Sequence, residues 1–181
     1  MSISNLSRRN FLKTAGIATG GLVLGVALPA NALAEKGIMN DSGASLNAFI
    51  HLAENGDTTL YCGRCEMGQG ISTALPSAVA DEMEADWQRV TVKQGDADEK
   101  FGPQATGGSA SIRKMYQPMR EAGATAKAML IAAAAKVWKT STDNCFAQAH
   151  FVINKTNQQK LGYGELASII ANMTVPETPT L

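Results

Sequence analysis

Apolar and polar residues alternate in three short runs, and this alternation predicts β-strands. The first two runs, residues 46–52 and 58–62, lie on either side of Asn55-Gly56. Asn-Gly is typical of tight hairpin turns because both residues tolerate positive φ. The third run covers residues 89–94 and predicts another strand. The pattern therefore begins with a β-hairpin and continues to a separate strand.

Two other stretches repeat their apolar residues with the spacing of a helix. In residues 71–86 the apolar positions share one face and acidic residues share the other, with Pro76 acceptable only near the helix start. The alanine-rich run 117–139 predicts a longer helix whose first turn contains Pro118. A short helical piece at 111–116 is expected before it.

The long segment 96–111 between these helices is polar and rich in glycine. It predicts a loop with no element of its own, and loops of this length in compact domains are usually functional or disordered.

The pattern weakens after residue 140. Residues 149–153 and 160–163 predict a strand pair, residues 165–172 a short helix, and residues 176–181 an extended polar tail. The element order is a β-hairpin–helix–strand–helix unit followed by a small β-β-α piece, which predicts a mixed α/β (α+β) fold. The final piece does not resemble a finished domain, so we expect residues 46–175 to be part of a larger one.

The first 34 residues predict an export signal. Arg8-Arg9 stands before the apolar run 14–28, and Ala32-Leu33-Ala34 supplies the small residues of a cleavage site. The run contains four glycines and is short for a membrane span, which needs about 20 residues. We therefore expect export by the twin-arginine route to the periplasm, residues 35–45 as a linker, and an uncleaved membrane anchor as the alternative.

Charge and composition exclude some classes of partner. Lys and Arg number 16, Asp and Glu also number 16, and 45% of the 181 residues are hydrophobic. The chain can therefore form a core, and it has no basic excess for nucleic acid or acidic lipid. Cleavage after Ala34 would remove three basic residues and no acidic ones, leaving a net charge of about −3.

Two glycine-dense loops each stand directly before a predicted helix. Glycine lets the backbone approach a ligand closely, and a helix N-terminus adds free N–H donors and a positive dipole end. Together these features form a cradle for an anion, usually phosphate. One such loop is often an ordinary turn, but two indicate a ligand with several phosphates, such as a dinucleotide. The candidate residues are Gly68, Gln69 and Gly70 in the first loop and Thr106, Gly107, Gly108, Ser109, Ala110 and Ser111 in the second.

A second motif, Cys62-Gly63-Arg64-Cys65, has the C-x-x-C spacing. A structural zinc site would need two more ligands, for which Cys145, His51 and His150 are the candidates. A redox pair would need a lowered thiol pKa at a helix start. A thiol or zinc module is therefore the less favoured alternative to an incidental pair of cysteines.

Residues 65–73, 85–90 and 105–113 together resemble the molybdopterin-binding large subunit of the xanthine dehydrogenase and aldehyde oxidase family. The similarity is greatest to the exported type, known as isoquinoline 1-oxidoreductase beta subunit or molybdopterin-binding aldehyde dehydrogenase. It extends from the signal to about Met173. The resemblance implies that residues 46–175 are the N-terminal part of a molybdopterin-binding domain.

The resemblance also implies an activity and a cofactor. Members of the family are molybdenum hydroxylases that oxidise aldehydes or N-heterocycles, with water as the oxygen source. The implied cofactor is molybdopterin cytosine dinucleotide with molybdenum. Electrons would leave through [2Fe-2S] clusters on a small partner subunit and, in exported types, pass to cytochrome c. Gly68, Gln69 and Gly70 would contact the pterin, and residues 106–111 would hold the pyrophosphate and nucleotide.

Members of that family are several times longer than this chain. Their general base, a glutamate, and further cofactor loops lie in the rest of the large subunit, and no acidic residue here matches that base. We therefore expect an incomplete active site that needs the remainder of the large subunit or a split partner chain. A non-catalytic remnant or binding domain is the alternative, and the sequence does not name the substrate.

Overall fold

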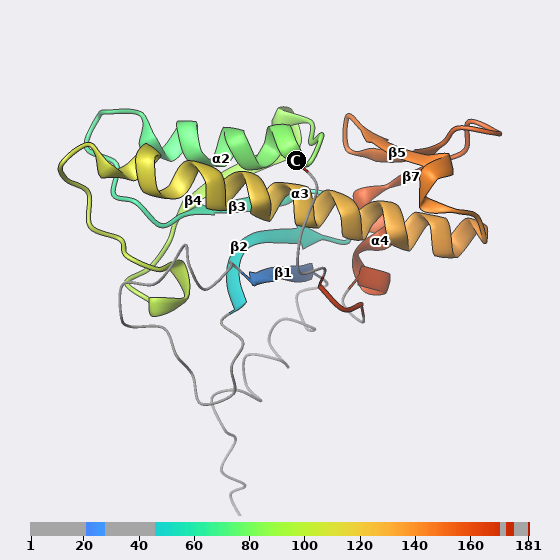
Figure 1. Ribbon diagram of the computed structural model, residues 1–181, viewed down its shortest axis with the longest axis horizontal. Coiled ribbons are helices and arrows are strands. Elements are labelled where there is room, and N and C mark those ends of the chain that lie inside the picture. The colour runs from blue at the N-terminus through green and yellow to red at the C-terminus, as the bar shows by residue number, and fades with distance from the viewer. Residues whose placement is uncertain (1–20, 28–45, 171–172, 176–180) are drawn as a thin grey trace, which may run out of the picture.

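The computed structural model describes residues 21–27, 46–170, 173–175 and 181, with side chains from residue 49 onward. Two long helices lie side by side along a four-stranded sheet, and a three-stranded sheet with a short helix lies at one end (Figure 1). One hydrophobic core joins the strands and helices. The predicted mixed α/β fold is confirmed.

The larger sheet has the strand order β1-β2-β3-β4. β1, β2 and β3 pair antiparallel, whereas β3 and β4 run parallel. The β2–β3 turn is the predicted hairpin, with Gly56 at φ 89°. The parallel pair needs a crossover, and helix α2 provides it. The strands are β1 (Gly21–Ala27), β2 (Leu46–Ala53), β3 (Thr58–Cys62) and β4 (Val90–Gln94).

Strand β1 is formed by part of the apolar run that the sequence assigns to the export signal. In the uncleaved chain it pairs antiparallel with β2. The arginine pair, the expected cleavage site and the linker 35–45 lie outside the described residues. Cleavage after Ala34 would remove β1 and leave β2 at the edge of the sheet.

The longer helix differs from the prediction at its start. Helix α3 is continuous over Ala110–Trp138, so the expected start at Gln117 and the expected separate piece at 111–116 are wrong. Pro118 lies inside the helix and is buried. An interior proline costs about 3 kcal/mol in lost hydrogen bonding and steric conflict. The packing of the buried face offsets that local cost, since most helical stability in proteins comes from tertiary contacts.

Helix α2 spans Ile71–Glu82 and contains Pro76 in its second turn, so it ends four residues before the predicted position 86. It packs closely on α3 at Gly123. A Cβ added at Gly123 would lie 2.5 Å from the carbonyl oxygen of Val79. Backbone therefore meets backbone at this point, and no side chain larger than hydrogen fits between the two helices.

The smaller sheet contains three strands in the order β5-β6-β7, where the sequence predicted two. β5 was missed because four residues are too few to show a clear alternation. Residues 149 and 150, expected within a strand, form the two-residue turn between β5 and β6, with φ values of 47° and 71°. The elements are β5 (Cys145–Gln148), β6 (Phe151–Asn154), β7 (Lys160–Gly162) and helix α4 (Tyr163–Ile170).

His150 connects the smaller sheet to the larger one. Its ring is fully buried, and Nδ1 accepts a hydrogen bond from the backbone N–H of Asp86 at 2.9 Å. Nε2 therefore carries the proton and donates to the carbonyl of Gly56 at 2.9 Å, with Thr58 Oγ1 3.1 Å away. Burial lowers the pKa of His150 below its ordinary value. The imidazole is thus a neutral structural group, and neither nitrogen is available to a metal.

Candidate functional site

The loop between β3 and α2 has a fixed backbone shape. Gly68 and Gly70 adopt φ values of 91° and 82°, a region that residues with a Cβ rarely occupy. A Cβ added at either position would meet no atom within 4 Å. The backbone angle, rather than lack of space, therefore requires glycine at both positions.

The carboxylate of Glu66 fills the cradle at the start of α2. It accepts hydrogen bonds from the backbone N–H groups of Gly68, Gly70 and Ser72 at 2.7, 3.0 and 2.9 Å, and from Ser72 Oγ at 2.7 Å. These bonds lower the pKa of Glu66 to about 2. The expectation that the start of α2 offers free donors to a phosphate is therefore wrong for this structure, because a side chain of the same loop already occupies it.

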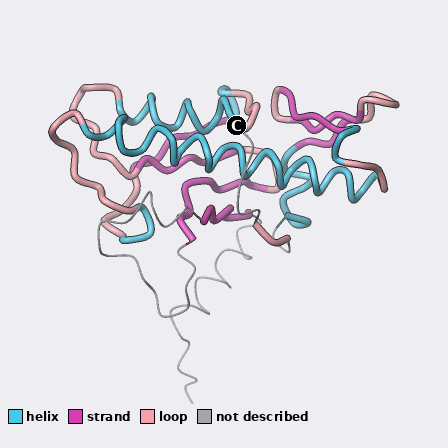
Figure 2. Tube along the Cα trace, in the orientation of Figure 1, coloured by secondary structure: helices cyan, strands magenta, loops and turns pink. Residues whose placement is uncertain are grey.

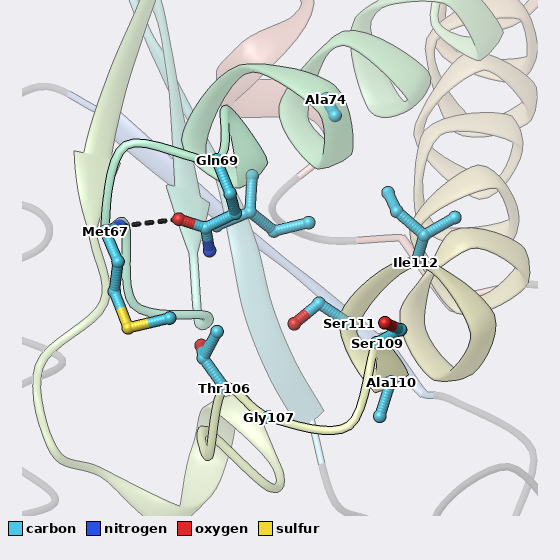
Figure 3. A pocket seen from close by; sticks show the side chains of 10 residues that line it. Met67, Gln69, Ala74, Thr106, Gly107, Ser109, Ala110, Ser111 and Ile112 are labelled. Carbon is cyan, nitrogen blue, oxygen red and sulfur yellow. Dashed lines mark hydrogen bonds between the residues drawn. The ribbon is translucent and has the colours of Figure 1, made fainter.

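Gln69 spans the same loop with its side-chain amide. Its Oε1 accepts from the backbone N–H of Met67 at 2.6 Å, and its Nε2 donates to the carbonyl of Cys65 at 3.0 Å. Both amide atoms thus hold the loop, while the side chain also forms part of a cavity wall (Figure 3).

The second loop is anchored by an element that the sequence did not predict. A 3₁₀ helix at Glu99–Phe101 interrupts the long segment, and Phe101 is buried with its ring centroid 5.9 Å from that of Phe49 and 5.8 Å from that of Tyr61. Further along, Thr106 Oγ1 donates to the carbonyl of Cys65 at 3.2 Å. The two loops are thus joined directly, at the end of the molecule where α2 and α3 begin (Figure 2).

The start of α3 differs from the start of α2. Ser109 occupies the N-cap position in a left-handed conformation, and no side chain caps the helix by a hydrogen bond. Gly108 has φ 57°, and a Cβ added at Gly107 or Gly108 would meet no atom within 4 Å. The N-terminus of α3 therefore faces open space lined by backbone, which is the arrangement that binds phosphate in many proteins.

A cavity of about 430 Å³ lies between the two loops. Figure 3 shows Met67 and Gln69 on one side of it and Ile112 on the other. Six of the nine predicted site residues line the cavity, whereas Gly68, Gly70 and Gly108 do not. The lining residues are Met67, Gln69, Ile71, Ala74, Thr106, Gly107, Ser109, Ala110, Ser111 and Ile112.

The sequence analysis missed the apolar part of the lining. Ile71 and Ala74 lie one turn apart at the start of α2, and Met67 and Ile112 are 70% and 45% exposed. Helical spacing directly after the glycine loop could have pointed to Ile71 and Ala74, because both fall on the face next to that loop. The cavity thus combines an apolar surface with hydroxyl groups and open backbone.

None of the residues that line the cavity is ionisable. Within the described ranges, no group of three or more His, Cys, Asp or Glu side chains could hold a metal ion. The uncapped start of α3 and the apolar part of the lining suit an anionic, partly apolar ligand, and the lining contains no general acid or base.

The two cysteines of the C-x-x-C motif lie in different environments. Cys62 is buried and its thiol donates to the carbonyl of Arg64 at 3.4 Å, whereas Cys65 is exposed. Burial raises the pKa of the Cys62 thiol. A reactive or metal-binding cysteine needs the thiolate, so this environment argues against a thiol or zinc module. No helix in the described part of the chain is both long and apolar enough to cross a membrane.

Comparison with known proteins identifies the family of this chain. Residues 4–180 match the family model described as molybdopterin cofactor-binding domain. The chain belongs to this family. Over 180 residues it is 33% identical to the isoquinoline 1-oxidoreductase subunit beta of Brevundimonas diminuta, a match that covers 96% of this chain and 23% of that protein.

Another relative of this molybdopterin cofactor-binding chain is the membrane-bound aldehyde dehydrogenase (pyrroloquinoline-quinone) of Gluconacetobacter polyoxogenes. The identity is 31% over 169 residues, which is 91% of this chain and 21% of that protein. The chain thus spans less than a quarter of the length of these two relatives.

Solved structures support the same fold. The Cu,Mo-CO dehydrogenase matches with a TM-score of 0.55 and 17% identity, over 88% of this chain and 21% of that one. Quinoline 2-oxidoreductase from Pseudomonas putida 86 matches with a TM-score of 0.53 and 14% identity, over 67% of this chain and 15% of that one. At these identities the likeness concerns the fold.

Proposed function

We propose that this chain is the cofactor-binding part of the large subunit of a molybdenum hydroxylase, which oxidises aldehydes or N-heterocycles with water as the oxygen source. The observation that carries the proposal is the uncapped N-terminus of α3, which faces a cavity between two glycine loops in a molybdopterin cofactor-binding domain. The family membership supports the cofactor class, and the cavity at the start of α3 supports a site for the cofactor there.

The residues present fit a cofactor of this kind. The open backbone at Gly107 and Gly108 leaves room for a phosphate group, and the hydroxyls of Ser109 and Ser111 offer donors beside it. Residues 106–111 would hold the pyrophosphate and nucleotide of molybdopterin cytosine dinucleotide. Gly68, Gln69 and Gly70 would shape the wall on the pterin side. When bound, the molybdenum centre supplies the redox chemistry of the hydroxylation.

The proposed enzyme needs further protein. The cavity lining contains no ionisable group, so the general base would come from the remainder of the large subunit or from a split partner chain. A small subunit with [2Fe-2S] clusters would accept the electrons and pass them to cytochrome c. The names of the relatives, which include a subunit beta, support an assembly of several chains.

We also propose export by the twin-arginine route, with cleavage after Ala34. Sequencing the N-terminus of the protein recovered from the periplasm tests this directly, and we expect it to begin at Glu35. Replacing Arg8 and Arg9 together by lysine should retain the chain in the cytoplasm with its leader. Recovery of the uncleaved chain in the membrane fraction would instead favour the anchor.

Cofactor content tests the proposed function. The chain should be produced in a host that makes the molybdenum cofactor, together with its partner chains, and its molybdenum and cytidine nucleotide measured after purification. We expect both in stoichiometric amounts. In a Gly107→Val variant both should be lost while the protein stays folded, because Gly107 lines the cavity and a Cβ added there would meet no protein atom within 4 Å.

Thr156→Val in the exposed β6–β7 turn is the control for that variant, and it should keep its cofactor. A chain that is folded but contains neither molybdenum nor cytidine would favour a non-catalytic remnant. A purified assembly that contains a bound quinone cofactor but no molybdenum would also overturn the proposal. Full loading of Gly107→Val would show that the cofactor does not occupy this cavity.

A further inference from the structure

Arg64 carries a buried positive charge that nothing in the described structure compensates. Its side chain is 3% exposed, and Nη1 donates to the carbonyl oxygen of Ala105. Its other two nitrogens, Nε and Nη2, are buried and have no hydrogen-bond partner. Arginine does not give up its proton in proteins, so the charge persists, although burial lowers its pKa.

Such a group is costly to keep. Burying a charge without a partner strongly destabilises a fold, and Arg64 takes part in none of the ion pairs shown between described residues. A methionine of similar length would fill the same space without the cost. The buried arginine therefore points to a negative group that the described residues do not supply.

The position of Arg64 relates that negative group to the cavity. Arg64 immediately precedes Cys65, whose carbonyl accepts hydrogen bonds from Gln69 and Thr106, two residues of the cavity wall. Its guanidinium binds Ala105, the residue before Thr106. The charge therefore lies directly behind the wall where the two loops meet.

We propose that Arg64 supplies the positive charge that attracts the pyrophosphate of the bound nucleotide, acting from behind the wall formed by Ala105 and Thr106. This inference rests on the proposed function, since it assigns a residue to the phosphate side of the same cavity. Arg64 is a positioning residue in this role: the open start of α3 makes the contacts, and the guanidinium sets the local potential.

Electrostatics supports an action without direct contact. A charge in the protein interior acts over several ångströms because the effective dielectric constant is low, and salt screens it much less than a surface charge. The cavity lining offers no competing cation. The carboxylate of Glu66 keeps its negative charge, because the donors that bind it at the start of α2 are neutral. Glu66 is exposed, so water and salt screen its charge far more than the buried charge of Arg64.

Binding of inorganic pyrophosphate to the full chain tests the inference. Calorimetry should compare the wild type with Arg64→Met, Arg64→Lys and the control Lys160→Met, which removes an exposed charge on the remote strand β7. We expect Arg64→Met to bind at least about tenfold more weakly, because a buried unit charge several ångströms away, at an effective dielectric constant of about 20, changes the binding free energy by more than the about 1.4 kcal/mol that a factor of ten represents. Arg64→Lys should keep most of the affinity, and Lys160→Met should match the wild type.

The thermal unfolding temperature without pyrophosphate is a second measurement. The change from wild type to Arg64→Met should have one sign if Arg64 serves binding and the opposite sign if its role is purely structural. If Arg64 is kept for binding, Arg64→Met should unfold at a higher temperature than the wild type, because the buried charge is gone. If its bond to Ala105 merely holds the loops together, Arg64→Met should unfold at a lower temperature and bind pyrophosphate unchanged.

Pyrophosphate affinity that is equal in the wild type and in Arg64→Met would overturn the inference, as would a wild type that does not bind pyrophosphate. Loss of affinity in both Arg64→Met and Arg64→Lys would also overturn it, because the positive charge would then not be what matters. The proposed function fails separately, through absence of molybdenum and cytidine from the wild-type assembly.

Discussion

The close contact between α2 and α3 makes a quantitative prediction for Gly123→Ala. The new Cβ would lie 2.5 Å from the carbonyl oxygen of Val79 and 2.9 Å from Cβ of Glu82. Both atoms belong to α2, and the nearer one is backbone, so a rotamer change cannot relieve the conflict. The helices would have to separate, and the ion pair between Glu82 and Arg120, 2.5 Å apart, would be stretched with them.

The size of the effect follows from that geometry. To restore an ordinary contact of 3.4 Å, the helices must move apart by about 0.9 Å. A gap of this size removes about a quarter to a half of the dispersion energy between the facing atoms. Overpacking of a core costs about 1–3 kcal/mol, and the rigid backbone obstacle places this site near the upper end. Alanine regains about 1 kcal/mol over glycine in a helix, so we expect a net loss of about 2 kcal/mol.

Urea and thermal unfolding of the full chain would measure this loss, with a decrease in Tm of about 4–8 °C. Gly107→Ala makes the same chemical change where the new Cβ meets no atom within 4 Å, and its Tm should stay within a degree or so of the wild type or rise slightly. A Gly123→Ala chain as stable as the wild type would refute the reasoning, because α2 and α3 could then separate without cost.

Three further predictions concern single side chains. Because burial lowers the pKa of His150, the unfolded chain binds a proton that the folded chain does not, so the free energy of unfolding should fall as the pH drops below about 6.5. Urea titrations at pH 7.5 and 5.5 would show the fall, and His150→Gln should reduce it; an unchanged slope would contradict this. Glu66→Gln should speed amide hydrogen exchange at Gly68 and Gly70, because the Glu66 carboxylate accepts hydrogen bonds from their N–H groups. Equal exchange rates in the variant and the wild type would disprove these hydrogen bonds. Gln69→Ala, in the complete assembly, should sharply lower turnover while protein level holds, and undiminished activity with full molybdenum loading would exclude a role for that amide.

Much of the main fold could be predicted from the sequence. The Asn55-Gly56 hairpin, the strand after α2 and the long alanine-rich helix all have local signals that agree with their final environment. The start of α3 could not be predicted in this way. Pro118 is a local signal for a helix boundary, and only the packing of the buried helix face overrides that signal. β5 was missed for a different reason, since a strand of four residues is defined by its partner β6 more than by its own pattern.

The candidate site could be predicted only in part. Glycine marked both loops, together with threonine and serine in the second, and the structure brings six of the nine expected residues to one cavity. The sequence could not show that Glu66 folds back onto its own loop, since this depends on the φ values of Gly68 and Gly70. Nor could it show that Arg64 is buried, because arginine beside a strand is usually exposed.

The turn between β5 and β6 has a consequence for the order of folding. Two-residue hairpin turns favour Asn and Gly, yet here Ala149 and His150 adopt positive φ, which costs residues with a Cβ about 1–2 kcal/mol each. The bonds of His150 to Gly56 and Asp86 join residues 94 and 64 positions apart, and they exist only after the larger sheet has formed. We therefore expect the hairpin to be unstable by itself and to dock late, so that mutations in β5 and β6 chiefly speed unfolding while mutations in β2, β3 and α2 slow folding.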